Sequence, residues 1–346
     1  MKRFLALALA ALMALSFVAC GSSAPAATTA APAPTTAAPA PAPAAEKTIY
    51  VIVKVLGNQY WSVVQAGAEQ AGKDFGCKVV IVGTAAESDI EGQVRYLQDA
   101  VSAKADGIVI SPLDRTSLAA PIAEQYGKTP IVLIDSNVDG DAYDCSLLTD
   151  NIQAGRMAAE EMIKKLKAKG VPESQQGVIA IQAGSTGSQA INDRLVGFNE
   201  YWDANAPAAW TVLNDDIKIN DGDISKAVGF CQDFITTYPD ILGMFGPNNG
   251  STVGFVTGLT EANRTDITMV GFDFSSEMET MIRSGNFDVS SVVQRQYFMG
   301  YDGVKAALDL ANGGSVSEKV IDTGVMLVDP ENVDSPAVQD IINPGK

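Results

Sequence analysis

The sequence predicts an α/β protein with two doubly wound domains, each built on a parallel sheet that helices cover on both faces. Short runs rich in Val and Ile alternate with longer segments of helical periodicity, which is typical of buried parallel strands joined by helices. The alternation ends near residue 150 and then begins again. The folded part, about 300 residues from Lys47 onward, is also longer than one hydrophobic core usually supports.

The first unit contains four expected strands and three expected helices. The strands are 49–53, 79–82, 107–110 and 131–134, and the helices are 62–75, 90–103 and 118–126. Gly76 ends the first helix, and Ser111-Pro112 stops the third strand. Apolar residues recur at helical spacing along the second helix.

The second unit repeats this architecture. Its expected helices are 151–169, 190–205, 225–237, 251–261, 276–284 and 297–312, and its strands are 178–182, 211–213, 243–245, 268–272, 289–293 and 324–328. The first of these helices has Met157, Met162, Ile163 and Leu166 on its apolar side. The alternation alone therefore indicates two consecutive units, without a repeat of the sequence itself.

The N-terminus has the features of a secretory signal peptide, expected over residues 1–20. Lys2 and Arg3 form a positive segment, an apolar run follows, and Phe17-Val18-Ala19 leads directly into Cys20. This arrangement resembles a bacterial lipobox, in which the cysteine is lipidated and becomes the mature N-terminus. Cys20 is therefore the expected lipidation site. The alternative is an ordinary signal peptide with an incidental cysteine.

The next segment, residues 21–46, is expected to be a disordered linker. It consists almost entirely of Ala, Pro, Thr and Ser, so it cannot bury enough apolar surface to offset chain entropy. Its prolines favour extended polyproline-II conformations. After a lipidated cysteine, such a linker would tether the folded part outside the cytoplasm, at the cell surface or in the periplasm.

The composition excludes several classes of function. A formal net charge of −17 argues against nucleic-acid binding, which needs a basic surface. The chain has no histidine, the commonest general base and metal ligand, and it has neither a Walker A segment nor a nucleophile elbow. We therefore expect no enzyme and no cofactor. A glycosidase pair made of Asp135 and Asp273 is the enzymatic alternative.

No metal site is expected either. The sequence NDGDI at 220–224 resembles part of an EF-hand loop, but with Gly222 as the sixth position Ile217 and Ile219 would occupy ligand positions. Three cysteines remain beyond Cys20, and because three is odd, at least one thiol must stay unpaired. They are Cys77, Cys145 and Cys231.

Polar and aromatic side chains follow most of the expected strands. In open α/β sheets ligands bind beyond the carboxyl ends of the strands, so these residues are the candidates for a site. They are Lys54, Asn58, Tyr60, Trp61, Ser111, Asp114, Asp135, Asn137, the loop 184–188 with Arg194, Asn248, Asn249, Asp273 and Gln294. Carboxylates, amides and cations together suit the hydroxyls of a polyol, and aromatic rings suit the C–H face of a sugar. Taken singly, each has a simpler explanation as a cap, a turn, core filling or a surface charge.

Several segments resemble one known family. GNQYW at 57–61, ADGIVISPLD at 105–114, PIVLIDSN at 130–137 and LLTDNIQAGRMAAE at 147–160 are similar to the ribose-type periplasmic sugar-binding proteins, the solute-binding lipoproteins of bacterial ABC importers. TTYPDILGMFGPNNGSTVGF at 236–255 and ITMVGFDFS at 267–275 follow the same pattern. The resemblance covers Thr48 to about Val328.

The resemblance implies the periplasmic binding protein type 1 fold, with two lobes joined by a three-crossover hinge. The N-terminal lobe would comprise 47–149 plus 295–323, and the C-terminal lobe 150–294 plus 324–346. The implied function is capture of a monosaccharide or related polyol between the lobes by hinge closure and delivery to the ABC permease, and the protein is expected to be a monomer. The ligand positions carried over are Lys54, Asn58, Tyr60, Trp61, Ser111, Asp135, Ser136, Arg194, Asn248, Phe272, Asp273 and Gln294.

Departures from the family pattern bear on the ligand. Lys54 replaces a serine of the ribose binders, Ser136 replaces an arginine, and an aromatic near Gly222 is missing, so ribose is not favoured. Lys54 and the proline before Asn248 resemble the autoinducer-2 binding branch, but the Asp-Gln pair of that branch is absent at positions 190 and 191. The alternatives are an autoinducer-2 or other small-ligand binding protein, or a sensory receptor subunit of the same fold. A repressor core would need an N-terminal helix-turn-helix in place of the signal and linker.

Overall fold

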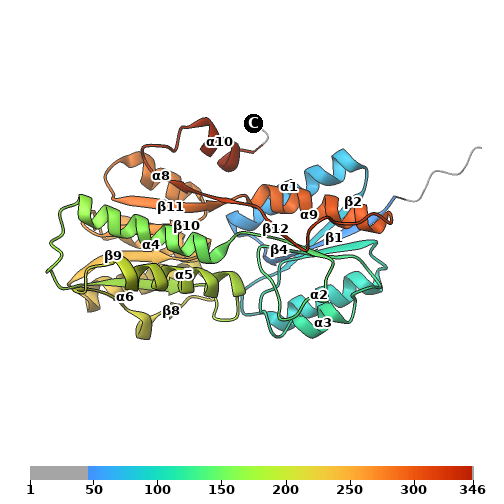
Figure 1. Cartoon of the computed structure of the whole chain (residues 1–346), viewed down its shortest axis with the longest axis horizontal. Coiled ribbons are helices and arrows are strands. Elements are labelled where there is room, and N and C mark those ends of the chain that lie inside the picture. Colours follow the sequence, from blue (N-terminus) through green and yellow to red (C-terminus); the bar gives the residue numbers. More distant parts are fainter. Residues whose placement is uncertain (1–45, 345–346) are drawn as a thin grey trace, which may run out of the picture. The chain divides into compact units, whose positions relative to one another are not determined.

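The computed structural model describes residues 46–344 (Figure 1). The predicted signal peptide, the lipidation site Cys20 and all but the last residue of the predicted linker lie outside the described residues. The described residues form a single compact unit that contains two sheets.

The first sheet has the strand order β12-β5-β4-β3-β1-β2, and all its strands are parallel. The strands are β1 Thr48–Val55, β2 Lys78–Thr84, β3 Gly107–Ile110, β4 Ile131–Ile134, β5 Cys145–Leu148 and β12 Val320–Asp322. Side chains alternate across this sheet. Val51 and Val53 pack with α1 (Gln59–Phe75) and α9 (Gln296–Ala311), whereas Ile52 belongs to the core beneath α2 (Ile90–Ser102) and α3 (Ala119–Ala123).

The second sheet has the order β13-β11-β10-β9-β6-β7, with β8 paired to the end of β6. The strands are β6 Gly177–Ala183, β7 Trp210–Val212, β8 Lys218–Ile219, β9 Ile241–Gly246, β10 Thr268–Phe272, β11 Val289–Gln294 and β13 Val325–Val328. Helices α4 (Asn151–Ala168) and α5 (Gln189–Asn205) cover one face, and α6 (Ile224–Thr237), α7 (Asn249–Glu261), α8 (Ser276–Ser284) and α10 (Pro336–Ile342) cover the other.

The chain passes between the two sheets three times: after β5, after β11, and between β12 and β13. The sequence pattern alone was therefore wrong to place 297–312 in a second consecutive unit, because α9 packs on the first sheet against α1, β3 and β4. An apolar helix face does not show which sheet it covers. The residue limits predicted for the two lobes remain a prediction, since the described residues form one compact unit.

Close helix pairs hold each half together and depend on glycine. In the second half, a Cβ at Gly155 of α4 would collide with the carbonyl oxygen of Arg194 on α5, and one at Gly197 with the carbonyl oxygen of Ile152. Gly67 of α1 and Gly300 of α9 meet the facing backbone in the same way in the first half. These contacts fix the path of the helix that carries Arg194.

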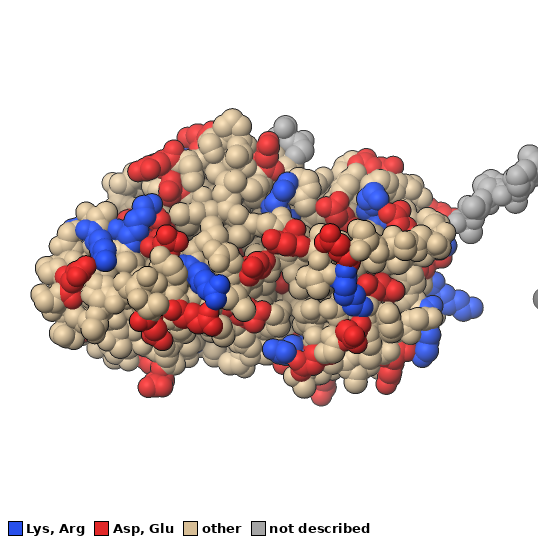
Figure 2. Space-filling model, in the orientation of Figure 1, with Lys and Arg blue, Asp and Glu red and all other residues tan. Residues whose placement is uncertain are grey.

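The structure corrects several element predictions. β1 continues through Lys54 to Val55, α1 begins at Gln59 rather than residue 62, and β13 pairs antiparallel with β11 in an otherwise parallel sheet. The short strands β5, β8 and β12 and the helix α10 were not expected. Within residues 46–344, no helix has the length and apolar character required to cross a membrane. Acidic and basic side chains are interspersed on the face shown in Figure 2.

Candidate functional site

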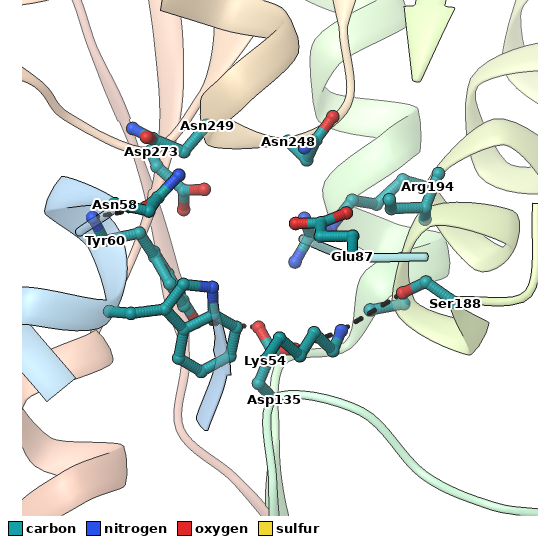
Figure 3. A pocket seen from close by; sticks show the side chains of 13 residues that line it. Lys54, Asn58, Tyr60, Glu87, Asp135, Ser188, Arg194, Asn248, Asn249 and Asp273 are labelled. Carbon is teal, nitrogen blue, oxygen red and sulfur yellow. Dashed lines mark hydrogen bonds and ion pairs between the residues drawn. The ribbon is translucent and has the colours of Figure 1, made fainter. Parts of the chain in front are cut away.

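A cavity lies where the carboxyl ends of strands from both sheets meet. Its volume is about 30 Å³, well below the ~300–1,000 Å³ typical of small-molecule sites, so this conformation leaves little free space between the two halves. Its lining is polar except for a few rings and aliphatic side chains (Figure 3). The lining residues are Lys54, Asn58, Tyr60, Trp61, Glu87, Asp135, Ser188, Ala190, Ile191, Arg194, Asn248, Asn249 and Asp273.

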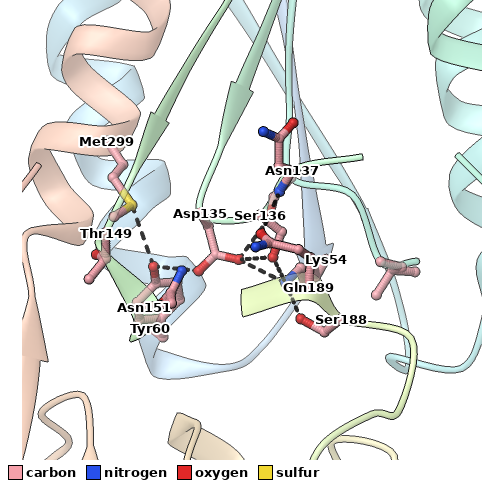
Figure 4. A network of polar contacts seen from close by, with 12 residues as sticks. Lys54, Tyr60, Asp135, Ser136, Asn137, Thr149, Asn151, Ser188, Gln189 and Met299 are labelled. Atoms are coloured by element: carbon pink, nitrogen blue, oxygen red, sulfur yellow. Dashed lines mark hydrogen bonds and ion pairs between the residues drawn. The ribbon is translucent and has the colours of Figure 1, made fainter. Parts of the chain in front are cut away.

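Lys54, near the end of β1, is 5% exposed and makes three polar contacts (Figure 4). Its Nζ lies 2.7 Å from Asp135 Oδ2 and donates hydrogen bonds to Ser136 Oγ at 2.6 Å and Ser188 Oγ at 3.2 Å. An ammonium group has three protons, so each can be accounted for by a protein acceptor. Lys54 is therefore the ion-pair partner of Asp135 in this conformation, which is why a cation can lie inside a buried strand.

Asp135 follows β4 and accepts hydrogen bonds from three hydroxyls. Tyr60 Oη donates at 2.8 Å, Ser111 Oγ at 3.1 Å and Ser136 Oγ at 3.0 Å. Burial by itself would raise the pKa of this carboxyl, but Lys54, Arg194 and the hydrogen bonds outweigh burial and lower it. Asp135 therefore carries a negative charge that Lys54 balances.

Asp273 occupies the corresponding place after β10 of the second sheet. Gln294 Nε2 donates to its Oδ1 at 2.8 Å. Burial raises the pKa of Asp273 to about 6, although Arg194 and the Gln294 bond pull it down. Asp135 and Asp273 both have left-handed backbones, with φ of 63° and 67°. Non-glycine residues adopt this conformation at some cost, and such strain is common at functional sites.

Arg194 on α5 is held on three sides. Its Nε donates to Asn151 Oδ1 at 2.8 Å, its Nη1 donates to Pro247 O at 2.9 Å, and its guanidinium stacks 4.1 Å from the centre of the Phe272 ring. Its Nη2 is buried and has no partner among the described residues, and the same is true of Asn249 Nδ2. A buried donor without an acceptor is costly, so these two nitrogens suit acceptor atoms of a ligand.

Tyr60 and Trp61 form the aromatic part of the wall. Both lie in the first turn of α1, which Asn58 caps by accepting the Tyr60 N–H at 2.8 Å. Their rings meet edge to face at 4.8 Å between centroids, and both side chains are buried. Burial, followed by the charge of Asp135, raises the pKa of Tyr60 well above its usual value. Tyr60 therefore acts as a neutral hydrogen-bond donor.

Hydrogen bonds join the two halves across the cavity. Besides Lys54 to Ser188, the Glu87 N–H donates to Asp221 O at 3.3 Å, and the Ser276 N–H donates to Gln59 Oε1 at 3.1 Å. The structure therefore shows the two sheets drawn together around the cavity.

Eight of the twelve predicted ligand positions line the cavity: Lys54, Asn58, Tyr60, Trp61, Asp135, Arg194, Asn248 and Asp273. The other four lie behind them. Ser111 and Ser136 bond to Asp135, Phe272 stacks under Arg194, and Gln294 bonds to Asp273. Contact of all twelve with a ligand remains a prediction.

Two other polar residues at strand ends lie off the cavity, as the contacts of their side chains show. Asp114 Oδ1 accepts the N–H groups of Thr116 and Ser117, and Asn137 Nδ2 donates to Tyr143 Oη. Both act as local turn-stabilising residues.

The prediction of ligand positions left out five lining residues. They are Glu87, Ser188, Ala190, Ile191 and Asn249. Ser188 and Asn249 stood in segments already singled out at strand ends. Glu87 lies beyond the expected strand 79–82, the one strand of the first unit for which no following residue was considered, so the same rule would have found it.

The three cysteines beyond Cys20 are not paired with one another. Cys77, Cys145 and Cys231 are buried and free, and burial raises the thiol pKa to about 11 at Cys145 and about 12 at Cys231. In the part of the chain that the structure describes, no cluster of three or more potential ligands could hold a metal ion.

Comparison with known proteins places this architecture in a family. The periplasmic binding protein domain matches residues 49–315, well over half of the chain. The chain belongs to the periplasmic binding protein family. Its members are substrate-binding proteins of transporters and act outside the cytoplasm.

Solved structures and a curated relative agree with this assignment. A carbohydrate transporter solute-binding protein from Agrobacterium radiobacter, in complex with D-arabinose, is 36% identical, with 86% of this chain and 99% of that chain covered and a TM-score of 0.81. An ABC transporter solute-binding protein from Agrobacterium vitis with bound D-fucose is 31% identical, with 85% and 99% covered and a TM-score of 0.78. The D-allose-binding periplasmic protein of Escherichia coli (strain K12) is 25% identical, with 77% of this chain and 85% of its own length covered.

Proposed function

We propose that this periplasmic binding protein is the extracytoplasmic substrate-binding subunit of an ABC importer and captures a monosaccharide or related polyol in the cavity between its lobes. The observation that carries the proposal concerns two buried donors, Arg194 Nη2 and Asn249 Nδ2, which have no partner among the described residues and belong to side chains that line the same cavity as Asp135 and Asp273. Hydroxyl groups both donate and accept, so a polyol can satisfy both kinds of partner at once. The Trp61 ring would cover a C–H face of the sugar.

The mechanism follows from the division of the site between the two sheets. One half supplies Asp135 and the aromatic pair, and the other supplies Arg194, Asn249 and Asp273. A ligand bound in an open cleft meets only one of these sets, so it favours closure by its extra affinity for the closed form. The closed protein would then dock on the membrane permease, and no catalytic step is involved.

The remaining assignments belong to the same proposal. The ligand contacts would come from the twelve positions carried over from the family, and Cys20 would anchor the protein to the membrane as a monomeric lipoprotein. The lobes would be 47–149 plus 295–323 and 150–294 plus 324–346. Autoinducer-2 is disfavoured because Ala190 and Ile191 present aliphatic side chains to the cavity where the autoinducer-2 branch has a polar pair.

A thermal-shift screen tests the binding function. Pentoses, hexoses, deoxysugars and polyols are added singly to the purified protein. A sugar at about 100 times its Kd should stabilise the fold by about 2.7 kcal/mol, a rise in Tm of roughly 5 °C for a protein of this size. Arg194→Ala should remove the rise, whereas Arg156→Ala, which alters an exposed arginine paired with Glu200, should retain it. A shift with a non-carbohydrate only, or a full shift in the Arg194 variant, would contradict the proposal.

A further inference from the structure

Glu87 reaches the cavity from the loop between β2 and α2, a segment to which the family resemblance assigned no ligand contact. Its carboxylate lies beside Arg194 and Asn248 in Figure 3. This carboxylate, unlike the Glu87 backbone, makes no hydrogen bond or ion pair with another residue in the described range 46–344. An acceptor group on the wall of a site, without a protein partner, is free to bind a ligand.

The loop that carries Glu87 is held from both sides. Thr84 Oγ1 lies 2.5 Å from Lys54 O and 2.7 Å from Ala86 O, and its one proton can be donated to either carbonyl, which ties the loop to the end of β1. The Glu87 N–H donates to Asp221 O of the opposite half at 3.3 Å. The loop of Glu87 is therefore attached to the first half, and its hydrogen bond to Asp221 of the second half keeps the Glu87 carboxylate at the cavity.

Two glycines of the second half make room for this side chain. A Cβ at Gly184 would stand 2.5 Å from Glu87 Oε2, and a Cβ at Gly222 would stand 3.1 Å from Glu87 Cγ. Since both glycines lie in loops of the opposite half, Glu87 acquires this packing only when the halves are together. Its carboxylate is thus part of the closed site.

The charges that face the cavity do not balance. Lys54 pairs with Asp135 at 2.7 Å, and together with Arg194 it faces three carboxylates, those of Asp135, Asp273 and Glu87. Burial raises the pKa of Glu87, and the charges of Lys54 and Arg194 lower it. A hydroxyl or an ammonium group can donate to the Glu87 carboxylate. A carboxylate or phosphate on the ligand cannot donate, and it would be repelled by the excess negative charge.

We propose that Glu87 is a specificity-determining residue that closes over the ligand and makes the site select neutral or amino sugars against sugar acids and sugar phosphates. The inference rests on the proposed function, because it concerns which sugars the same cavity admits. It adds a residue from outside the set carried over from the family and a chemical class that the site rejects.

Isothermal titration with matched sugars tests the inference. The probes are D-galactose, D-fucose, D-galactosamine and D-galacturonate, which share the galactose configuration and differ in charge. The titrations are carried out at about pH 8, above the ordinary pKa range of carboxyl groups and above the pKa of about 6 of Asp273. The wild-type protein should bind D-galacturonate at least about tenfold more weakly than the tighter of the two neutral sugars. Glu87→Gln should lower this ratio of the two Kd values by roughly tenfold, because the repulsion between the Glu87 carboxylate and the acid is then removed. D-galactosamine should lose affinity in the same variant.

A matched control and the contrary outcomes complete the test. Glu91→Gln removes a charge from the exposed face of α2 near the same loop and should leave the ratio unchanged. A ratio that Glu87→Gln does not alter, or a wild-type protein that binds D-galacturonate as tightly as the neutral sugars, overturns the inference but leaves the proposed function standing. If neither these probes nor any sugar or polyol of the thermal-shift screen binds the wild-type protein, the proposed function is contradicted and the inference fails with it.

Discussion

Replacing Lys54 with methionine should destabilise the fold strongly, because it leaves a buried carboxylate without its cation. Methionine keeps the length and apolar stem of the side chain but removes the ammonium group. Lys54 and Asp135 each have a side chain only 6% exposed, and their charged atoms lie 2.7 Å apart. The change therefore tests whether Lys54 is an internal ion-pair partner.

The expected loss follows from this geometry. Removing one partner of a buried ion pair costs about 3–5 kcal/mol. Tyr60, Ser111 and Ser136 still donate to Asp135, so we expect about 3 kcal/mol, a fall in Tm of roughly 6 °C. The matched control is Lys47→Met, directly before the same strand, where loss of the partly exposed pair with Asp106 should cost no more than about 1 kcal/mol.

The dependence on pH has a definite sign. The lowered pKa of Asp135 contributes stability that is present above the pKa of the unfolded chain and is lost as pH falls through the folded value. Without Lys54 the effect of burial prevails, so the variant is penalised while the carboxyl is ionised. The stability difference between wild type and Lys54→Met should therefore shrink on acidification toward about pH 4.

Urea unfolding of the single and double variants decides the matter. Lys54→Met/Asp135→Asn removes both charges, and asparagine tolerates the left-handed backbone at 135, so the double variant should recover most of the lost stability. A single variant within about 1 kcal/mol of wild type, or a double variant no more stable than the single, would refute the ion-pair account.

Three further predictions concern the site and its support. Asp273→Asn should stabilise the ligand-free protein by about 1–3 kcal/mol at neutral pH, because the folded pKa of Asp273 is about 6 and its ionisation above that pH costs stability. Unfolding curves should show this gain in stability shrinking from about pH 6 to about pH 4. A gain that grows on acidification contradicts the raised pKa of Asp273. Arg194→Lys should weaken sugar binding at least about tenfold in calorimetry, because one ammonium group cannot both donate to Asn151, as Arg194 Nε does, and offer a second nitrogen to the ligand, as Nη2 can. Unchanged affinity would show that the guanidinium does not contact the ligand. Gly155→Ala should lower the free energy of unfolding by about 1–3 kcal/mol, because the added Cβ forces α4 away from α5. Gly229→Ala, which has open space around its Cβ position, should be neutral or stabilising in the same denaturation assay. Equal effects of the two changes would refute the packing argument.

The fold class was predictable because fully buried parallel strands carry an unmistakable composition. The Val- and Ile-rich strands of both sheets and the helices between them lie close to the expected ranges. The predictions were wrong where contacts with residues distant in the sequence decide the local structure. Lys54 was interpreted as the end of a strand, yet it continues β1 because Asp135 compensates its charge. Three-residue β12 is too short to carry a pattern, and nothing local specifies that β13 runs antiparallel.

The site was predictable to the extent that topology alone brings residues together. The rule that ligands bind beyond strand ends gathered ten of the thirteen lining residues, Ser188 in the loop 184–188 included. It could not separate a wall residue from one behind the wall: Ser111 and Gln294 follow the same pattern as Asp135 and Asp273 but serve as their hydrogen-bond donors. Such roles depend on side-chain direction, which spacing along the chain does not specify.

A crystal structure of the protein grown with the sugar that gives the largest thermal shift tests the central claim most directly. The account predicts one sugar ring in the cavity between the sheets, with oxygens accepting from Arg194 Nη2 and Asn249 Nδ2 and a C–H face against Trp61. A sugar bound elsewhere on the protein, or a closed cavity in which both nitrogens remain without an acceptor, would contradict it.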